Sequence, residues 1–209
     1  MAGFLVTFEG GDGCGKSTQI KLFTEFLKRE KIDFICTREP GGTDVGEQIR
    51  EILLHSKGKM SAETEFLLFS ASRSKIVEDV IKPALKDGKV VVLDRYYDSS
   101  YTYQGYAGDL RVKDLENITE FAIKGTVPDL TFLLDLSYDD AMKRKFGDEK
   151  LKNLDRIESK GENYHNKVRQ GYLLLAKKNK KRIVVIDANQ PIEKIEKQIQ
   201  DVFQKRYKK

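Results

Sequence analysis

The residues most able to do chemistry form a glycine-rich segment near the start of the chain, Gly10-Gly11-Asp12-Gly13-Cys14-Gly15-Lys16-Ser17. The segment matches the pattern G-x-x-x-x-G-K-[S/T], which is typical of loops that bind nucleotide phosphates. Glycines let the backbone curl so that successive N–H groups point at phosphate oxygens. Lys16 adds a positive charge near the β and γ phosphates, and the Ser17 hydroxyl is suited to ligate Mg²⁺. We therefore expect the loop to bind ATP.

The sequence on either side of this loop gives it the context that phosphate binding requires. The apolar run Phe4–Phe8 precedes it, and Ile20, Phe23 and Leu27 follow at helical spacing, which predicts a strand, the loop and then a helix. The positive end of such a helix points at bound phosphate. The residues expected to contact the nucleotide are Gly10, Gly11, Asp12, Gly13, Cys14, Gly15, Lys16, Ser17 and Thr18.

A second group with catalytic potential follows the apolar run Val90–Leu93, where the chain continues with Asp94 and Arg95. Ligands of parallel α/β sheets gather at the carboxyl ends of the strands. We expect this strand to neighbour Phe4–Phe8, which would bring both side chains beside the phosphate loop. Asp94 can orient Mg²⁺ through water, and Arg95 can bridge donor and acceptor phosphates in a transition state. A surface salt bridge is the alternative interpretation of the pair.

The elements that must hold these residues alternate along the chain. Five short runs rich in β-branched and aromatic residues are expected to be strands, namely Phe4–Phe8, Phe34–Thr37, Val90–Leu93, Leu130–Leu136 and Ile183–Ile186. Helical spacing fills the segments between them, including a long central region that ends near Pro83–Leu85, the segment Tyr164–Ala176 and a last helix after Ile192. This order predicts an α/β fold with a five-stranded, mostly parallel sheet and helices on both faces.

Length and composition narrow the class of protein. The 209 residues, of which 39% are hydrophobic, suit one domain that spans residues 1–209. No apolar run approaches the roughly 18–20 residues of a membrane-spanning helix, and the start of the chain lacks the features of a secretory signal. Cys14 and Cys36 are too few for a disulfide framework. These features together predict a cytoplasmic protein with no membrane partner. The surplus of 38 basic over 33 acidic residues is spread along the chain, so we expect no nucleic-acid partner.

Three motifs together resemble bacterial thymidylate kinases, and the resemblance covers essentially the whole chain. They are the phosphate loop with its preceding Phe8-Glu9, the segment Arg38–Thr43, and the segment Asp94–Gly105 with its pattern D-R-Y-x-x-S-x-x-x-Y-Q. The resemblance implies the P-loop NTPase fold and transfer of the γ-phosphoryl group of ATP to dTMP, which gives dTDP. It also implies Mg²⁺, with Ser17 and Asp94 at the metal, and a homodimer.

The resemblance assigns further roles around the acceptor. Phe69 would stack on thymine, Arg73 would donate to its O4, and Tyr103 would crowd the 2′ position and disfavour ribonucleotides. Arg50 and Arg95 would hold the acceptor phosphate. The full set expected to contact dTMP is Asp12, Glu39, Arg50, Phe69, Arg73, Arg95, Ser99, Ser100, Tyr103 and Gln104. For Phe69 taken alone, a place in the core is the other interpretation.

The charged stretch Lys143–Lys160 has weak periodicity, and we expect it to form a mobile lid that excludes water from the phosphates. Some thymidylate kinases carry a catalytic arginine at the loop position of Gly13, so the resemblance implies that the lid supplies this charge here. Arg156 is the first candidate, because Asp155-Arg156 matches the family pattern, and Arg144 is the second. The remaining candidates are Lys145, Lys150 and Lys152, and the full set of expected catalytic residues is Lys16, Asp94, Arg95, Arg144 and Arg156.

Two other functions remain open on the residues alone. The phosphate loop also suits a kinase for another nucleoside monophosphate or a deoxynucleoside, and it suits a switch protein whose nucleotide controls a partner. The pairs Phe69/Arg73 and Tyr103/Gln104 favour thymine and a deoxy sugar, and the sequence has no N-K-x-D guanine motif. Cys14 is interpreted as a small residue that fills the loop, with oxidation near the helix start as the alternative.

Overall fold

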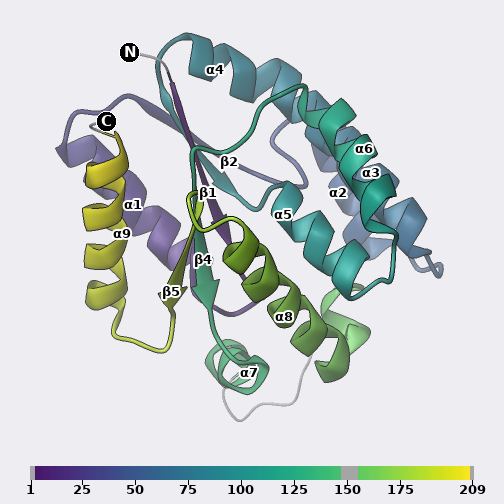
Figure 1. Cartoon of the computed structure of the whole chain (residues 1–209). Coiled ribbons are helices and arrows are strands. Elements are labelled where there is room, and N and C mark those ends of the chain that lie inside the picture. Colours follow the sequence, from purple (N-terminus) through teal and green to yellow (C-terminus); the bar gives the residue numbers. More distant parts are fainter. Residues whose placement is uncertain (1–2, 147–154, 208–209) are drawn as a thin grey trace.

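The computed structural model describes residues 3–146 and 155–207, which form a five-stranded sheet between two layers of helices (Figure 1). All neighbouring strands in this described part of the chain are parallel, in the order β2-β3-β1-β4-β5. The strands are β1 (Phe4–Glu9), β2 (Phe34–Arg38), β3 (Val90–Asp94), β4 (Leu130–Asp135) and β5 (Ile183–Asp187). Because β1 and β3 are neighbours, the loops that follow them lie side by side.

The five predicted strands are confirmed, and each boundary differs from the prediction by one residue at the carboxyl end. Their continuous apolar runs follow from burial on both faces, since every residue of Val90–Leu93 is fully buried under helices. The predicted end of the fourth strand at Leu136 is one residue too long, and the strand ends at Asp135.

The helices fill the segments between the strands as the alternating pattern predicts. In chain order they are α1 (Lys16–Arg29), α2 (Asp44–His55), α3 (Ala62–Ile76), the π-helical turn η1 (Val77–Ile81), α4 (Lys82–Lys86), α5 (Tyr97–Ser100), the π-helical turn η2 (Tyr101–Tyr106), α6 (Val112–Ile123), α7 (Tyr138–Phe146), the 3₁₀ turn η3 (Glu158–Lys160), α8 (Glu162–Lys178) and α9 (Ile192–Tyr207). Helix α6 went unpredicted, although its buried residues Leu115, Thr119 and Ala122 recur at helical spacing. None of the described helices combines the length and apolar character needed to cross a membrane.

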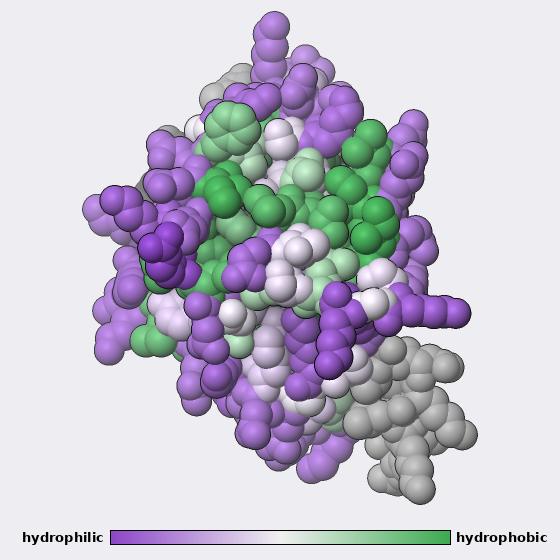
Figure 2. Space-filling view, turned by 90° about the vertical axis from the view of Figure 1, so that its right-hand side faces the viewer, coloured by the Kyte–Doolittle hydropathy of each residue, from purple (hydrophilic) through white to green (hydrophobic). Residues whose placement is uncertain are grey.

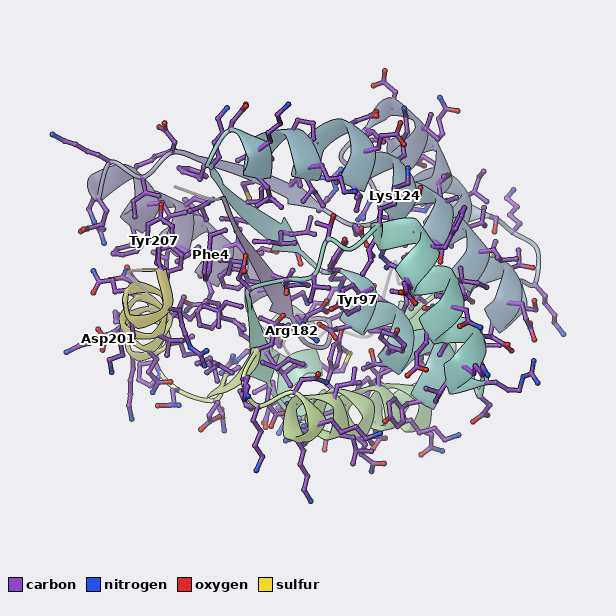
Figure 3. The ribbon with its side chains drawn as sticks, turned by 45° about the horizontal axis from the view of Figure 1, so that its top comes forward. Phe4, Tyr97, Lys124, Arg182, Asp201 and Tyr207 are labelled. Atoms are coloured by element: carbon purple, nitrogen blue, oxygen red, sulfur yellow. The ribbon has the colours of Figure 1, made fainter. Side chains whose placement is uncertain are left out.

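Helices α1 and α9 cover one face of the sheet (Figure 1). Phe23 of α1 packs edge-on against Phe203 of α9, with ring centroids 5.0 Å apart, and both side chains are almost fully buried. Figure 3 shows Phe4 of β1 beside Tyr207 of α9, where the ring centroids are 5.7 Å apart. This aromatic cluster anchors α1 behind the phosphate loop, because the helix starts at the last residues of that loop.

The opposite face is covered by the end of α3 with η1 and by α4, α5 and α8 (Figure 1). Ile76, Val77 and Ile81 of the long central region are fully buried against β3. Arg182, just before β5, lies over the ring of Tyr97 at 5.4 Å, and both labels lie close together in Figure 3. The Arg182 guanidinium also forms two hydrogen bonds with Asp98, at 2.6 and 2.8 Å, which fix α5 against the sheet.

Each strand ends in a charged residue: Glu9, Arg38, Asp94, Asp135 and Asp187. Since all five strands run in the same direction, these groups meet at one edge of the sheet, beside the phosphate loop. The fold thus concentrates charge where ligands of parallel sheets bind.

Candidate active site

A cavity of about 770 Å³ opens at the carboxyl edge of the sheet. Nearly all the residues that the sequence predicted for the nucleotide, the acceptor and the catalytic step line this one cavity, and the exceptions are Gly10, Gly11 and Arg156. Its volume falls in the range of small-molecule sites, about 300–1,000 Å³. The predicted residues come from six separate segments of chain, so the fold brings them together.

The phosphate loop holds its lysine inside the turn. The Lys16 ammonium is largely buried and donates hydrogen bonds to the carbonyl oxygens of Gly10 and Gly11, at 3.0 and 2.9 Å. Helix α1 begins at Lys16, so the positive end of its dipole points into the same space. Cys14 is buried and packs in the core cluster between α1 and the sheet, as expected for a residue that fills the loop.

Gly13 has to be a glycine in this fold. Its φ is +77°, and a Cβ there would lie 2.6 Å from the carbonyl oxygen of Ala141 in α7. Because α7 packs against the loop at this point, no arginine fits at position 13. The close approach of Ala141 therefore explains why the loop carries glycine where some thymidylate kinases carry arginine.

Arg95 lines the cavity next to the phosphate loop. Its backbone has a positive φ of 65°, which is uncommon for a residue with a side chain, and it turns the guanidinium back over the end of β3. The guanidinium donates to Asp12 at 2.7 Å and lies over the ring of Tyr103 at 5.2 Å. Burial works to raise the pKa of Asp12, but the charges of Arg95 and Lys16 outweigh it and hold that pKa well below its usual range. Asp12 is therefore ionised at neutral pH.

Glu9 is linked to Arg95 through two hydroxyl groups. The sequence predicts no role for it. The fully buried carboxylate accepts the hydroxyl protons of Ser99 and Tyr172, each at 2.7 Å. Each hydroxyl has one proton, so its lone pairs remain for the Arg95 guanidinium, which donates to Ser99 at 3.3 Å and to Tyr172 at 3.2 Å. Burial, and next the charge of Asp98, raise the pKa of Glu9. An acidic residue at the end of a buried strand was the available signal.

A second buried ion pair lies on the other side of the cavity. Arg73 is 1% exposed and donates through Nε to Glu39 at 2.9 Å and through a terminal nitrogen to Ser100 at 3.0 Å. One oxygen of Glu39 and the other terminal nitrogen of Arg73 are buried with no hydrogen-bond partner among the described residues. Burial raises the pKa of Glu39 to about 7, against the opposing charge of Arg73. Such unpaired atoms on a cavity wall are sites for a ligand's polar groups.

The remaining predicted acceptor residues also lie on the cavity wall. Phe69 is half-buried on α3, one turn before Arg73, and Gln104 is buried on η2. Arg50 donates to the carbonyl oxygen of Pro40 at 3.0 Å, which aims it at the same space. Asp94 has one carboxylate oxygen that is buried without a hydrogen-bond partner in the described structure.

The predicted lid is described only at its two flanks, and the candidates Lys150 and Lys152 lie outside the described residues. On the first flank, Arg144 and Lys145 line the cavity, and Lys145 pairs with Glu158 of the second flank. Arg156 points elsewhere. It donates to the carbonyl oxygen of Leu53 at 2.9 Å and to Glu65 at 2.6 Å, and it does not line the cavity.

The far end of the cavity uses residues that sequence reasoning missed. Gln190, Pro191, Ile192 and Ile195, in the turn before α9 and in its first residues, line it beside the phosphate loop. Gln19 of α1 donates to the carbonyl oxygen of Ile192 at 3.1 Å and holds this turn in place. Nothing in the residue types marks this turn, because its role comes from its position.

Comparisons with known proteins agree with one another. The family model described as thymidylate kinase matches residues 8–199. A thymidylate kinase of Thermoanaerobacter sp. (strain X514) is 45% identical over 205 residues, which is 98% of this chain and 99% of the relative. One from Kosmotoga olearia is 48% identical over 198 residues, 95% of this chain and 94% of the relative. A crystal structure of thymidylate kinase from Ehrlichia chaffeensis superposes with a TM-score of 0.78 at 30% identity, covering 98% of this chain and 100% of that one.

Replacing Glu39 with glutamine should change how stability depends on pH. The pKa of Glu39 is about 7 in the folded chain against an ordinary value of 4.5. Between pH 4.5 and about pH 7 the folded protein holds a proton on Glu39 that the unfolded chain has lost. The free energy of unfolding therefore falls as pH rises through this interval, by about 3 kcal/mol in total. Glu39→Gln lacks this titration, so its free energy of unfolding should rise relative to wild type over that interval.

The measurement is urea unfolding of both proteins at about pH 5 and about pH 8. Glu25→Gln, at an exposed position on α1, is the matched control and should follow the wild type. A difference between Glu39→Gln and wild type that stays constant across this range would contradict the raised pKa.

Proposed function

The chain belongs to the thymidylate kinase family, and we propose that the cavity at the carboxyl edge of its sheet is where it transfers the γ-phosphoryl group of ATP to dTMP. One observation carries this proposal. The phosphate loop with Lys16 and the base-binding candidates Phe69 and Arg73 line the same cavity, and so does Arg95, which is bound to Asp12 of the loop. A donor phosphate and an acceptor phosphate can therefore meet over the Arg95 guanidinium. We regard residues 1–209 as one catalytic domain.

On the donor side, the loop N–H groups and the positive end of α1 would hold the triphosphate, and Lys16 would contact the β and γ phosphates. The residues proposed to surround it run from Gly10 to Thr18. The apolar wall of Pro191, Ile192 and Ile195 lies farther along the cavity and suits the flat adenine base.

On the acceptor side, α3 supplies Phe69 for stacking on thymine, which is worth about 1–3 kcal/mol per base. The terminal nitrogen of Arg73 that has no hydrogen-bond partner among the described residues is a donor for the O4 oxygen of the base. Tyr103 is buried beside Asp12, and its hydroxyl donates to that carboxylate at 3.3 Å. We propose that Tyr103 crowds the 2′ position of the sugar and disfavours ribonucleotides. The other proposed acceptor contacts are Glu39, Arg50, Arg95, Ser99, Ser100 and Gln104.

The acceptor phosphate is itself the nucleophile. One of its oxygens forms a bond to the γ phosphorus while the bond to the bridging oxygen breaks, and ADP leaves with that electron pair. The protein's work is then to position and to neutralise charge. Arg95 touches both phosphates in this arrangement, and its place is fixed by Asp12, Ser99 and Tyr172. Arg144, on the cavity wall, is the flank residue that we assign to the departing phosphates, whereas Arg156 is bound elsewhere by Glu65.

The residues present fit a magnesium ion. Asp94 has a buried carboxylate oxygen that no described residue hydrogen-bonds, and Ser17 lines the same cavity, so both offer the oxygen ligands that Mg²⁺ prefers. We propose that these two residues hold the ion, Asp94 through water. When bound, Mg²⁺ offsets the charge on the β and γ phosphates. We also assign the enzyme to the cytoplasm.

We propose that two copies of the chain associate through helices α2, α3 and α6. Figure 2 shows apolar side chains gathered over this side of the molecule. Residues exposed there are Val45, Ile52, Leu67 and Phe121, with Phe121 80% exposed. An exposed cluster of large apolar residues on three packed helices is the usual sign of a protein interface.

Turnover with ATP, Mg²⁺ and a panel of dTMP, dUMP, UMP, dCMP, AMP and GMP tests the function directly. We expect a strong preference for dTMP. Lys16→Ala should abolish the activity and leave the fold intact, whereas Lys21→Ala, on the exposed side of α1, should act as wild type. Preference for another monophosphate would contradict the thymine pocket, and retained turnover in Lys16→Ala would remove the phosphate loop from the mechanism.

Tyr172→Phe should lower kcat about tenfold, because Arg95 loses one of the acceptors that hold it and a hydrogen bond to a charged group is worth about 1.5–3 kcal/mol. The ring of Tyr172 stays in the core, so the fold should persist, although the free energy of unfolding should fall by about 1–3 kcal/mol because Glu9 loses one hydrogen bond. Steady-state kinetics with dTMP and ATP measure this. The control is Tyr207→Phe, on the far side of the sheet against Phe4. Unchanged kcat in Tyr172→Phe would mean that Asp12 and Ser99 fix Arg95 without it.

Leu67→Glu should convert the dimer to a monomer, since a charge would be buried at the centre of the apolar face. Sedimentation velocity distinguishes the two states. Leu174→Glu, at a similarly exposed position on α8, is the control and should remain dimeric. A monomeric wild-type protein, or a dimeric Leu67→Glu variant, would contradict the proposed interface.

A further inference from the structure

Glu65, in the first turn of α3, is a buried carboxylate with three partners from two distant parts of the chain. It is fully buried, and one oxygen accepts from Arg156 at 2.6 Å and from Lys160 at 2.7 Å. The other oxygen accepts from the side-chain amide of Gln104 at 3.2 Å. Arg156 and Lys160 belong to the second lid flank, and Gln104 lines the cavity. One side chain thus joins the base of the lid to the acceptor end of the cavity.

The two cations keep Glu65 ionised. Burial alone would raise its pKa, but the hydrogen bonds from Arg156 and Lys160 outweigh that effect and lower it. An ionised carboxylate has no proton to give, so it can only accept hydrogen bonds. Both oxygens of Glu65 are therefore acceptors whenever the lid base is in place.

This constraint decides which way the Gln104 amide points. Only its NH₂ group can face an obligate acceptor, so its carbonyl oxygen lies on the opposite side of the amide. The reverse orientation would bring two oxygens together at the same place, in a buried site where such a mismatch is costly. Glu65, Phe69 and Arg73 lie four residues apart on α3, so the carboxylate follows the same helix face as the stacking ring and the free guanidinium nitrogen.

We propose that Glu65 is a positioning residue for base selection, which holds the Gln104 amide with its oxygen presented to the N3–H of thymine. The proposal rests on the function proposed above. Thymine offers an acceptor at O4 and a donor at N3, which match the Arg73 nitrogen and the Gln104 oxygen. Cytosine reverses both groups, with an amino group at C4 and a lone pair at N3. An amide that cannot turn around rejects cytosine, and Glu65 is what prevents the turn.

The assignment also gives a function to the lid flank. Arg156 and Lys160 keep Glu65 ionised, although neither of them lines the cavity. A purely structural carboxylate would stabilise the lid base and affect every acceptor nucleotide alike. A carboxylate that orients the amide affects the ratio between dTMP and dCMP.

The experiment compares kcat/KM for dTMP with kcat/KM for dCMP in wild type, Glu65→Gln and Lys160→Met. Glutamine at position 65 keeps the shape of the side chain, but it can present either its oxygen or its NH₂ group to Gln104. The Gln104 amide can then take either orientation, so the dTMP:dCMP ratio should fall about tenfold or more. Lys160→Met removes one lid-base charge, but Arg156 still binds Glu65 at 2.6 Å and keeps it ionised. The Glu65–Gln104 bond therefore stays, and the ratio should remain near that of wild type. An unchanged ratio in Glu65→Gln overturns the proposal, and so does an equal fall in both variants, which would trace the effect to the lid base.

Gln104→Met gives a second test that does not disturb the Glu65 ion pairs, in case Glu65→Gln fails to fold. Here kcat/KM for dTMP should fall while that for dCMP stays the same or rises, so the ratio drops again by about tenfold. A ratio equal to that of wild type would show that the amide plays no part in selection and would refute the role of Glu65. Failure of wild type to phosphorylate dTMP would instead refute the proposed function, so the two failures are distinguishable.

Discussion

A charged group buried at the carboxyl edge of this sheet must be paired, because an unpaired charge away from water costs several kcal/mol. The guanidinium of Arg95 is the group around which these pairings are arranged. Asp12 neutralises it from the phosphate loop, and Glu9 acts from beneath through the hydroxyls of Ser99 and Tyr172. Since these residues come from β1, the loop, α5 and α8, the position of one guanidinium fixes four elements relative to each other. That arrangement sets the distance between the proposed donor and acceptor sites.

The same requirement organises the acceptor wall, but there the pairing is incomplete. The ion pair of Arg73 and Glu39 leaves one buried atom on each partner without a hydrogen bond among the described residues. In a core this would be a defect, yet both side chains line the cavity. Atoms left unsatisfied by the protein are the ones that a substrate can satisfy, so a site that is costly alone becomes selective when occupied. The raised pKa of Glu39 has the same origin, in burial that Arg73 only partly offsets.

Patterns in the sequence predict the groups whose chemistry is local. The strand, loop and helix around Lys16 depend on neighbouring residues, as does the Asp94–Arg95 pair at a strand end, and the motif resemblance supplied Phe69 and Arg73. Glu9 and Tyr172 are 163 residues apart and meet only because β1 and α8 pack together. The role of Gly13 depends equally on distance, since it is the approach of Ala141 that excludes a side chain. Residue type reports what a group can do, and only packing determines which partner it meets.

Arg156 shows what this distinction means for mechanism. An arginine in a charged segment near a phosphate site suggests a direct contact with phosphate. In this fold, however, the Arg156 guanidinium is bound to the buried carboxylate of Glu65. The arrangement still serves phosphoryl transfer. If the proposed lid closed over ATP before the correct acceptor was bound, ATP would be lost to water, so a link between the lid flank and the base-recognition end would serve the enzyme. A shared carboxylate on the helix that carries Phe69 and Arg73 is such a link, because the flank binds one of its oxygens and Gln104 binds the other. The sequence analysis assigned the charge of Arg156 to the reacting phosphates. Bound to Glu65, this charge would instead influence which acceptor nucleotide the site selects.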